Sequence, residues 1–163
     1  MKGVLSMELI NVKMTEEKQV ACIFHTSSLA EINEDMGTLI TELMNWAMKN
    51  GVQMAGAPFT IHYSAPEEIS RGKMNYEVGF PFVGEAQAEG DIMIKTIHAQ
   101  QVISAIHKGS YGEIGPVYAA LMEYAAKNGY EIAGAPMELY LNNPLEVSEN
   151  ELLTEVQFPV IKR

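Results

Sequence analysis

A motif that occurs twice in the same order constrains the fold of this chain more than any other feature. The turn Ala-Gly-Ala-Pro begins at Ala55 and again at Ala133, and each copy leads through a short alternating segment to Glu-Val-X-Phe-Pro, at residues 77–81 and 155–159. The last residues of the two turns, Pro58 and Pro136, are 136 − 58 = 78 residues apart. A period of about 80 residues is too long for a solenoid repeat and indicates a duplicated domain half.

The segments before each turn match as well. Residues 19–25 are rich in β-branched and aromatic residues, as strands are. They align with residues 101–107 at an offset of 82, which pairs His25 with His107. Residues 36–48 and 116–126 show helical spacing, and both are followed by Lys-Asn-Gly. Each half therefore predicts strand-strand-helix-strand-strand, with repeats at about 7–83 and 91–161. We expect one α+β domain over residues 1–163, with an antiparallel sheet and two main helices.

Alternation along the last strands predicts where the carboxylates project. Glu155 alternates with Val156 and Phe158, while Glu138 and Tyr140 alternate with Leu139. If the apolar residues pack under a helix, Glu138, Tyr140 and Glu155 share the opposite face, as do Thr60, His62 and Glu77 in the first copy. Two interpretations stay open: these residues line a ligand groove between the halves, or they form the ordinary solvated side of a sheet.

Tyr111 is a further candidate for such a groove. It lies in His107-Lys-Gly-Ser-Tyr-Gly-Glu, where Gly109 and Gly112 give the chain freedom to turn before the second helix. This tyrosine is predicted either to lie at the rim of the groove or to be a partly buried aromatic residue in a glycine-containing loop.

Net charge narrows the class of partner. Eleven Lys and Arg residues against twenty-one Asp and Glu residues give −10. This charge opposes the phosphate backbone of nucleic acids and favours a cationic or neutral ligand, although acidity also serves solubility alone. Apolar runs stay well short of the ~20 residues that cross a bilayer, and the first residues do not resemble a secretion signal, so a cytoplasmic protein without a membrane partner is expected.

The sequence contains no recognisable motif for binding a cofactor or a metal ion. Cys22 is the single cysteine, in the apolar run 20–24, and is predicted to be a buried, inert thiol. The four histidines lack metal-ligand spacing, and phosphate-binding and dinucleotide-binding fingerprints are missing. We therefore expect no metal and no cofactor.

The second half carries a series of motifs that resembles a known family. The series begins with His107-Lys-Gly-Ser-Tyr-Gly-Glu-Ile, continues through Ala-Gly-Ala-Pro-Met-Glu-Leu-Tyr-Leu-Asn-Asn-Pro at 133–144, and ends with Thr-Glu-Val-Gln-Phe-Pro-Val at 154–160. Its order and spacing resemble the GyrI-like small-molecule-binding family, which includes effector-binding domains of AraC-type and MerR-type multidrug regulators. The resemblance implies two strand-helix-strand-strand modules in a pseudo-twofold arrangement with a ligand cleft.

The same resemblance implies ligand contacts for four residues and a function. The ligand-binding positions of the family match Glu138, Tyr140, Glu155 and Tyr111, whereas the first copy departs from the pattern around His62 and Glu77. Only a few residues precede the first expected strand, so no DNA-binding segment and no direct nucleic-acid binding are expected. The leading hypothesis is a stand-alone module that captures lipophilic, cationic or planar small molecules.

Two alternatives follow from relatives within the family. The first is a hydrolase of cyclopropane-bearing DNA-alkylating toxins, in which Glu155, Glu138 and Tyr111 would move protons to and from an attacking water molecule and a developing oxyanion. The second is a protein-interaction role as an inhibitor of DNA gyrase.

Overall fold

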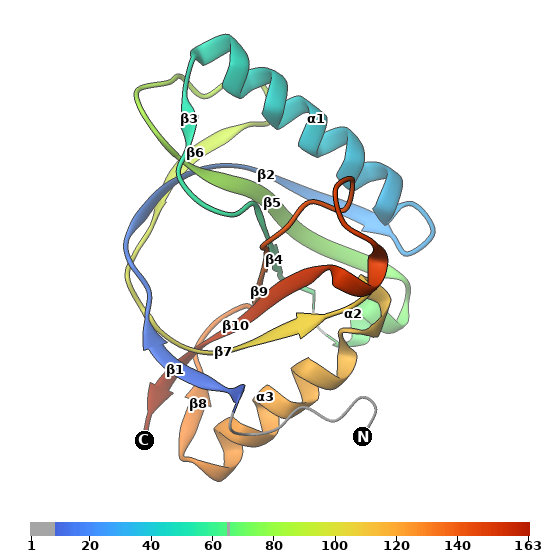
Figure 1. The fold of residues 1–163 in the computed structure, drawn as a ribbon, viewed down its shortest axis with the longest axis vertical. Coiled ribbons are helices and arrows are strands. Elements are labelled where there is room, and N and C mark those ends of the chain that lie inside the picture. Colours follow the sequence, from blue (N-terminus) through green and yellow to red (C-terminus); the bar gives the residue numbers. More distant parts are fainter. Residues whose placement is uncertain (1–8, 65) are drawn as a thin grey trace. The chain divides into compact units, whose positions relative to one another are not determined.

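The computed structural model describes residues 9–64 and 66–163, which form an α+β fold of antiparallel strands and two long helices (Figure 1). This confirms the predicted fold class. The chain divides into two compact units, one formed by residues 17–98 and the other by the N-terminal residues up to Glu16 together with residues 99–163. Each unit is described by itself below.

The unit of residues 17–98 is built around the two long antiparallel strands β2 and β5. Its sheet has the order β4-β5-β2-β6, with antiparallel neighbours throughout, and the short β3 pairs with the far end of β5. The bounds of its elements are β2 (Lys18–Ser28), α1 (Ile32–Asn50), β3 (Gln53–Met54), β4 (Phe59–His62), α2 (Pro66–Ser70), β5 (Lys73–Val83) and β6 (Met93–Ile97).

The other unit has the same plan. Its strand order is β9-β10-β7-β1, and the short β8 pairs with the far end of β10. The bounds are β1 (Asn11–Met14), β7 (Gln101–Lys108), the 3₁₀ turn η2 (Tyr111–Glu113), α3 (Gly115–Lys127), β8 (Tyr130–Ile132), β9 (Met137–Tyr140), the 3₁₀ turn η3 (Glu149–Glu151) and β10 (Leu153–Lys162). The strand orders of the two units therefore match.

The edge strands β1 and β6 each pair with a strand from the other half of the sequence. β1 precedes β2 in the chain but pairs with β7, while β6 precedes β7 but pairs with β2. Each sheet thus takes its outermost strand from the other half of the sequence. The boundaries between the compact units consequently fall at 16/17 and 98/99, whereas the predicted repeats divide between residues 83 and 91.

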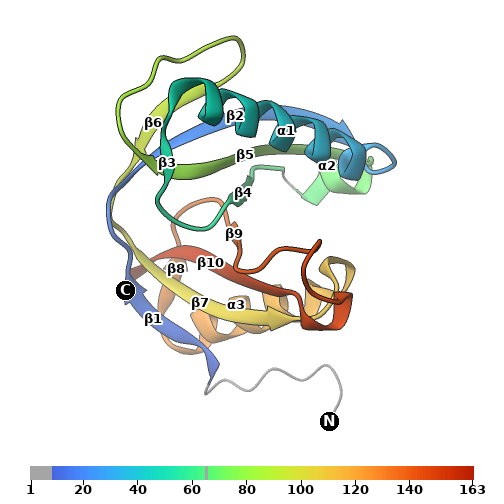
Figure 2. The same ribbon diagram turned by 45° about the horizontal axis from the view of Figure 1, so that its top comes forward.

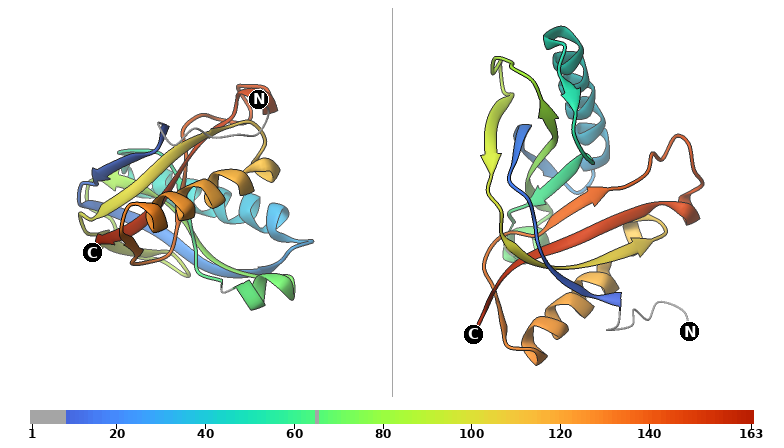
Figure 3. Two further views of the ribbon diagram at one scale, coloured as in Figure 1. Left: turned by 90° about the horizontal axis from the view of Figure 1, so that it is seen from below. Right: turned by 60° about the vertical axis from the view of Figure 1, so that its left-hand side comes forward.

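In each unit one long helix covers one face of its own sheet (Figure 2, Figure 3). We call this the helix face, and the other side the opposite face. Leu39, Leu43 and Trp46 of α1 pack on Ile23, Tyr76 and Val78. Val117, Leu121 and Ala125 of α3 pack on Ile103, Val156 and Phe158. Burial of these apolar side chains is the main force that holds each helix on its sheet.

Glycine determines two local features. Gly51 ends α1 in the left-handed conformation, with φ of 64°, and its N–H bonds the carbonyls of Ala47 and Met48, which confirms the predicted helix stop. Gly79 permits β5 to approach β2 closely, since a Cβ atom there would lie 2.3 Å from the carbonyl oxygen of Ala21.

Across the described part of the chain, no helix combines the length and apolar character that a membrane crossing requires.

Candidate functional site

The register between β9 and β10 separates Glu138 from Glu155. Glu138 lies directly across from Val156, and Glu155 lies across from Leu139. Directly opposed residues project from the same face of a sheet. Val156 packs under α3, so Glu138 is on the helix face and Glu155 is on the opposite face.

The prediction that Glu138, Tyr140 and Glu155 share one face is therefore wrong. Alternation of apolar and polar residues shows which residues of one strand project from the same side. Only the pairing register shows which residues of the neighbouring strand project from that side as well. Because the side-chain period is two, a register offset of one residue exchanges the faces completely. Leu139, predicted to pack under the helix, faces away from it.

Glu138 lies in a cluster of tyrosines. Its carboxylate accepts a hydrogen bond from the Tyr118 hydroxyl at 2.5 Å and another from the Tyr140 hydroxyl at 3.2 Å. The ring of Tyr111 meets that of Tyr140 edge to face, with centroids 5.6 Å apart. We call Glu138, Tyr111, Tyr118 and Tyr140 the acidic tyrosine cluster. It brings together three predicted residues and one residue that no sequence motif indicated, Tyr118 of α3.

Burial and the Glu138 charge keep the phenols of Tyr111 and Tyr118 protonated. Burial raises the pKa of the Tyr118 hydroxyl far above its usual value, and the negative charge of Glu138 raises it further. Burial and the same carboxylate also raise the pKa of Tyr111. The Tyr118 and Tyr140 hydroxyls both donate to Glu138, and these hydrogen bonds fix the carboxylate among aromatic rings.

Glu155 lies in a different environment. Lys13 of β1 donates to its carboxylate at 2.6 Å, and the Gln157 side-chain amide donates at 2.8 Å. Burial alone would raise the pKa of Glu155, but the hydrogen bonds from Gln157 and Lys13 and the lysine charge outweigh it and leave the pKa below its ordinary value. Glu155 is thus an ionised group that already has a cation beside it.

Glu77 is the equivalent residue in the unit of residues 17–98. Its buried carboxylate accepts hydrogen bonds from Lys95 Nζ and the Tyr63 hydroxyl, each at 2.6 Å, and the Cys22 thiol lies 3.5 Å away. Burial opposes ionisation, yet Lys95 and Tyr63 together hold the pKa of Glu77 below its usual value. Burial and the Glu77 charge raise the pKa of Cys22 to about 12. The predicted burial of Cys22 is confirmed.

His62 and Thr60 do not share a face with Glu77, so this prediction is also wrong. In the β4–β5 register, Thr60 lies across from Val78 and His62 across from Tyr76, while Ile61 lies across from Glu77. Val78 and Tyr76 belong to the core under α1. The physical reason is the same as in the other unit, a register that differs by one residue from the predicted one.

Comparison with known proteins identifies the family of this chain. Residues 9–161 match the family profile of the GyrI-like small molecule binding domain. The chain belongs to the GyrI-like family. Curated protein sequences give no significant match.

This GyrI-like chain is similar in structure to EcmrR. It matches the crystal structure of the EcmrR C-terminal domain with 26% identity and a TM-score of 0.84, over 94% of this chain and 98% of that one. It matches EcmrR in a DNA complex with 25% identity and a TM-score of 0.83, over 96% of this chain. In that comparison it spans only 59% of the EcmrR chain.

More distant structures share the fold alone. A hydrolase from Listeria innocua matches with 9% identity and a TM-score of 0.66, over 93% of this chain and 91% of the other. SAV2435, in a structure bound to tetraphenylphosphonium, matches with 14% identity and a TM-score of 0.61, over 93% of both chains.

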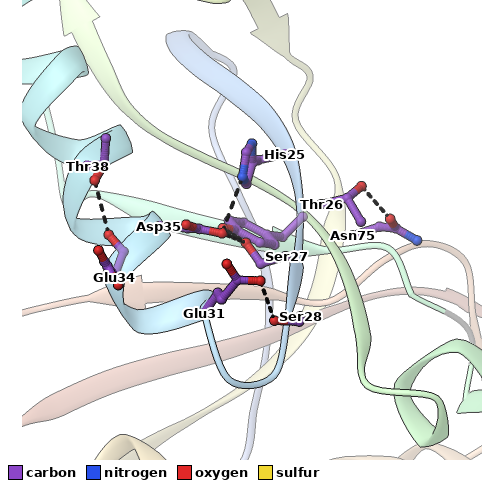
Figure 4. A network of polar contacts seen from close by, with 10 residues as sticks. His25, Thr26, Ser27, Ser28, Glu31, Glu34, Asp35, Thr38 and Asn75 are labelled. Atoms are coloured by element: carbon purple, nitrogen blue, oxygen red, sulfur yellow. Dashed lines mark hydrogen bonds and ion pairs between the residues drawn. The ribbon is translucent and has the colours of Figure 1, made fainter.

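A polar network in this GyrI-like domain joins β2 to the first turn of α1 (Figure 4). Ser27 Oγ donates to Asp35 at 2.6 Å and lies 2.8 Å from the Tyr76 hydroxyl. His25 Nε2 lies 3.4 Å from the same Asp35 oxygen. Ser27 and Tyr76 are buried, so the bonds satisfy polar atoms that have lost water, and we assign the network a structural role.

Other candidate sites are weaker. Residues 9–64 and 66–163 contain no group of three or more histidine, cysteine or acidic side chains placed to hold a metal ion. Two surface hollows occur in the unit of residues 17–98, one beside Gln19 and Gly84 and the other beside Glu42 and Asp91. The residues that line them include none of the predicted carboxylates and no member of the acidic tyrosine cluster.

Proposed function

We propose that this GyrI-like domain binds lipophilic cations, and that the acidic tyrosine cluster is the site that recognises them. One observation carries the proposal: the Glu138 carboxylate is held by the hydroxyls of Tyr118 and Tyr140 beside the ring of Tyr111. A carboxylate among aromatic rings offers charge and apolar surface in the same place.

Each part of the cluster matches one property of such a ligand. The Glu138 charge attracts a cation, and the ring faces of Tyr111 and Tyr140 add cation–π attraction of about 0.5–2 kcal/mol. Tyr111 is 40% exposed, so its ring is within reach of a molecule in solution. The apolar parts of the same rings suit a lipophilic body attached to the cation.

The other predicted carboxylates have a different role in this proposal. Lys13 neutralises Glu155, and Lys95 neutralises Glu77. A cationic ligand would have to displace a lysine ammonium from either glutamate, which offsets the Coulomb attraction gained. We therefore assign the recognition of positive charge to Glu138. Direct contacts of Glu155, Glu77 and His62 with a ligand stay predictions.

The hydrolase alternative requires Glu138 and Glu155 to lie close to the same reacting atoms, and their positions do not support this. Glu138 and Glu155 project from opposite faces of one sheet. Two groups that exchange protons with the same reacting atoms must both lie within hydrogen-bond distance of them. We therefore propose capture of the ligand rather than turnover. The net charge of −10 also supports a cationic small molecule over nucleic acid as the partner.

A fluorescence titration with a panel of cationic dyes tests this proposal. Rhodamine 6G and ethidium supply lipophilic cations of different shape, and fluorescein supplies an anionic dye of similar size. We expect saturable binding of at least one cationic dye, weakened at high salt, and no binding of fluorescein. Binding of fluorescein as tight as that of the cations, or no binding of any cation, would overturn the proposal.

A further inference from the structure

An aromatic pair lies on the opposite face of the sheet formed by residues 17–98. Phe24 of β2 is directly across from Glu77, and its ring centroid lies 6.1 Å from that of Tyr63, which follows β4. Phe24 is 50% exposed and Tyr63 44% exposed. The Tyr63 hydroxyl is fixed by its hydrogen bond to Glu77, so the ring has a defined position although much of it is exposed. We call Phe24, Tyr63, Glu77 and Lys95 the aromatic patch.

The polar part of the aromatic patch is electrically balanced. Lys95 and Glu77 form one ion pair at 2.6 Å, and the Tyr63 and Cys22 side chains beside it are neutral. The Lys95 side chain is 36% exposed, whereas that of Glu77 is 4% exposed. A molecule that reaches the patch therefore meets ammonium N–H donors before it meets the carboxylate. This environment favours an uncharged acceptor over a cation.

The other unit contains the same ion pair without the aromatic residues. Glu155 is paired with Lys13, and the residue directly across from it on β7 is Ile106. Leu141 stands 78 residues after Tyr63, at the corresponding position after β9. Charge is thus equivalent in the two units, and aromatic surface distinguishes them.

We propose that the aromatic patch is a second ligand site, for uncharged planar aromatic compounds with a hydrogen-bond acceptor, and that Lys95 determines this preference. The ligand ring packs on Phe24 and Tyr63, where offset or edge-to-face contact between rings is favourable. Its acceptor receives a hydrogen bond from Lys95 Nζ. By neutralising Glu77, Lys95 prevents the patch from selecting cations.

NMR of the full chain with ¹³C-labelled methionine methyl groups tests the proposal. Met93 lies across from Cys22 on β6, two residues from Lys95, and is 45% exposed, so its methyl signal reports on the patch. The probes are acridone, which is neutral and has a carbonyl acceptor, and 10-methylacridinium, a cation of the same ring size. We expect acridone to shift the Met93 signal with at least fivefold higher affinity than the cation.

Variants separate the aromatic contribution from the charge preference. Phe24→Leu should weaken acridone binding about tenfold, whereas Ile106→Leu, at the equivalent position in the other unit, should leave it unchanged. Lys95→Met should raise affinity for 10-methylacridinium at least tenfold, because the Glu77 carboxylate then has no ammonium group paired with it. Lys95→Met/Glu77→Gln removes both charges, avoids an unpaired buried carboxylate, and should restore the preference for acridone.

The outcomes distinguish this site from the acidic tyrosine cluster. Glu138→Gln should not alter the Met93 titration, whatever it does to the binding of cationic dyes. An unmoved Met93 signal with acridone, or wild-type selectivity in both Lys95 variants, would overturn the proposal. So would a shift confined to Met122 of α3, since that residue reports on the other unit.

Discussion

Glu138 and Glu155 project from opposite faces of the β9–β10 pair, although both belong to the strands that carry the motifs of the family. Glu138 contacts tyrosines on the helix face, while Glu155 is held by Lys13 on the other side. The two carboxylates therefore differ in position and in their partners: tyrosine hydroxyls donate to Glu138, whereas Glu155 is part of an ion pair with Lys13.

Glu77 should make folding stability depend on acidic pH. Its folded pKa is lower than that of an unfolded glutamate, about 4.3, so its contribution is fully present above that value. The contribution is lost as the pH falls through the folded pKa. Urea unfolding of Glu77→Gln between pH 6 and pH 2 should show lower stability at pH 6 and a shallower loss on acidification. An equally steep loss in the variant would contradict this assignment.

The Lys95–Glu77 and Lys13–Glu155 ion pairs should differ in what they contribute to the free energy of unfolding. The Glu77 side chain is 4% exposed and that of Glu155 is 13% exposed, so loss of the lysine leaves Glu77 with less access to water. We expect Lys95→Met to lower the free energy of unfolding by about 3 kcal/mol and Lys13→Met by about 1–2 kcal/mol. Urea unfolding at pH 7 measures both. A larger loss for Lys13→Met would show that exposure does not decide the cost.

Gly79→Ala tests the close approach of β5 to β2. The added Cβ would lie 2.3 Å from the Ala21 carbonyl oxygen, a backbone atom that cannot move without disturbing the sheet. We expect a loss of at least about 2 kcal/mol in the free energy of unfolding. Gly37→Ala is the matched control: its site on α1 is open, and alanine should stabilise the helix by about 0.5–1 kcal/mol. Equal effects of the two changes would be inconsistent with this packing.

Cys22 should be unreactive in the folded protein. The thiol is fully buried, and its pKa of about 12 leaves almost no thiolate at neutral pH. Labelling with a chromogenic disulfide reagent at pH 8 should be negligible over an hour and complete once urea unfolds the chain. Stoichiometric labelling of the folded protein within minutes would show that β2 opens far more readily than its pairing with β5 and β6 implies.

Sequence reasoning predicts the elements of this fold better than the arrangement of its site. Alternating strands, two amphipathic helices and the Asn50-Gly51 stop are local signals, and the structure contains all of them. The register of β9 on β10 is not local. The alternation of Glu138 with Leu139 fits either face of the sheet, and only pairing with Val156 decides between them.

Two further features depend on contacts between distant segments. The pairing of β1 with β7 and of β6 with β2 leaves no signal in the sequence of either strand. Lys13 and Lys95 can be aligned as equivalent positions of the two repeats, but the sequence does not predict that they form ion pairs with Glu155 and Glu77. Tyr118 repeats the position of Ile40 in α1, at the offset of 78 residues, and that substitution of an aromatic for an aliphatic residue was the available signal. Its hydroxyl acquires a partner only when α3 packs on β9.

Isothermal titration calorimetry with tetraphenylphosphonium tests the central claim most directly, by comparing the wild-type chain with Glu138→Gln and Glu155→Gln. Tetraphenylphosphonium is a lipophilic cation, and circular dichroism confirms that each variant is folded. If the acidic tyrosine cluster is the cation site, Glu138→Gln should weaken the binding of tetraphenylphosphonium at least tenfold, while Glu155→Gln should change it less than threefold. Wild-type affinity in Glu138→Gln, or a loss confined to Glu155→Gln, would contradict the assignment of the cation site to Glu138.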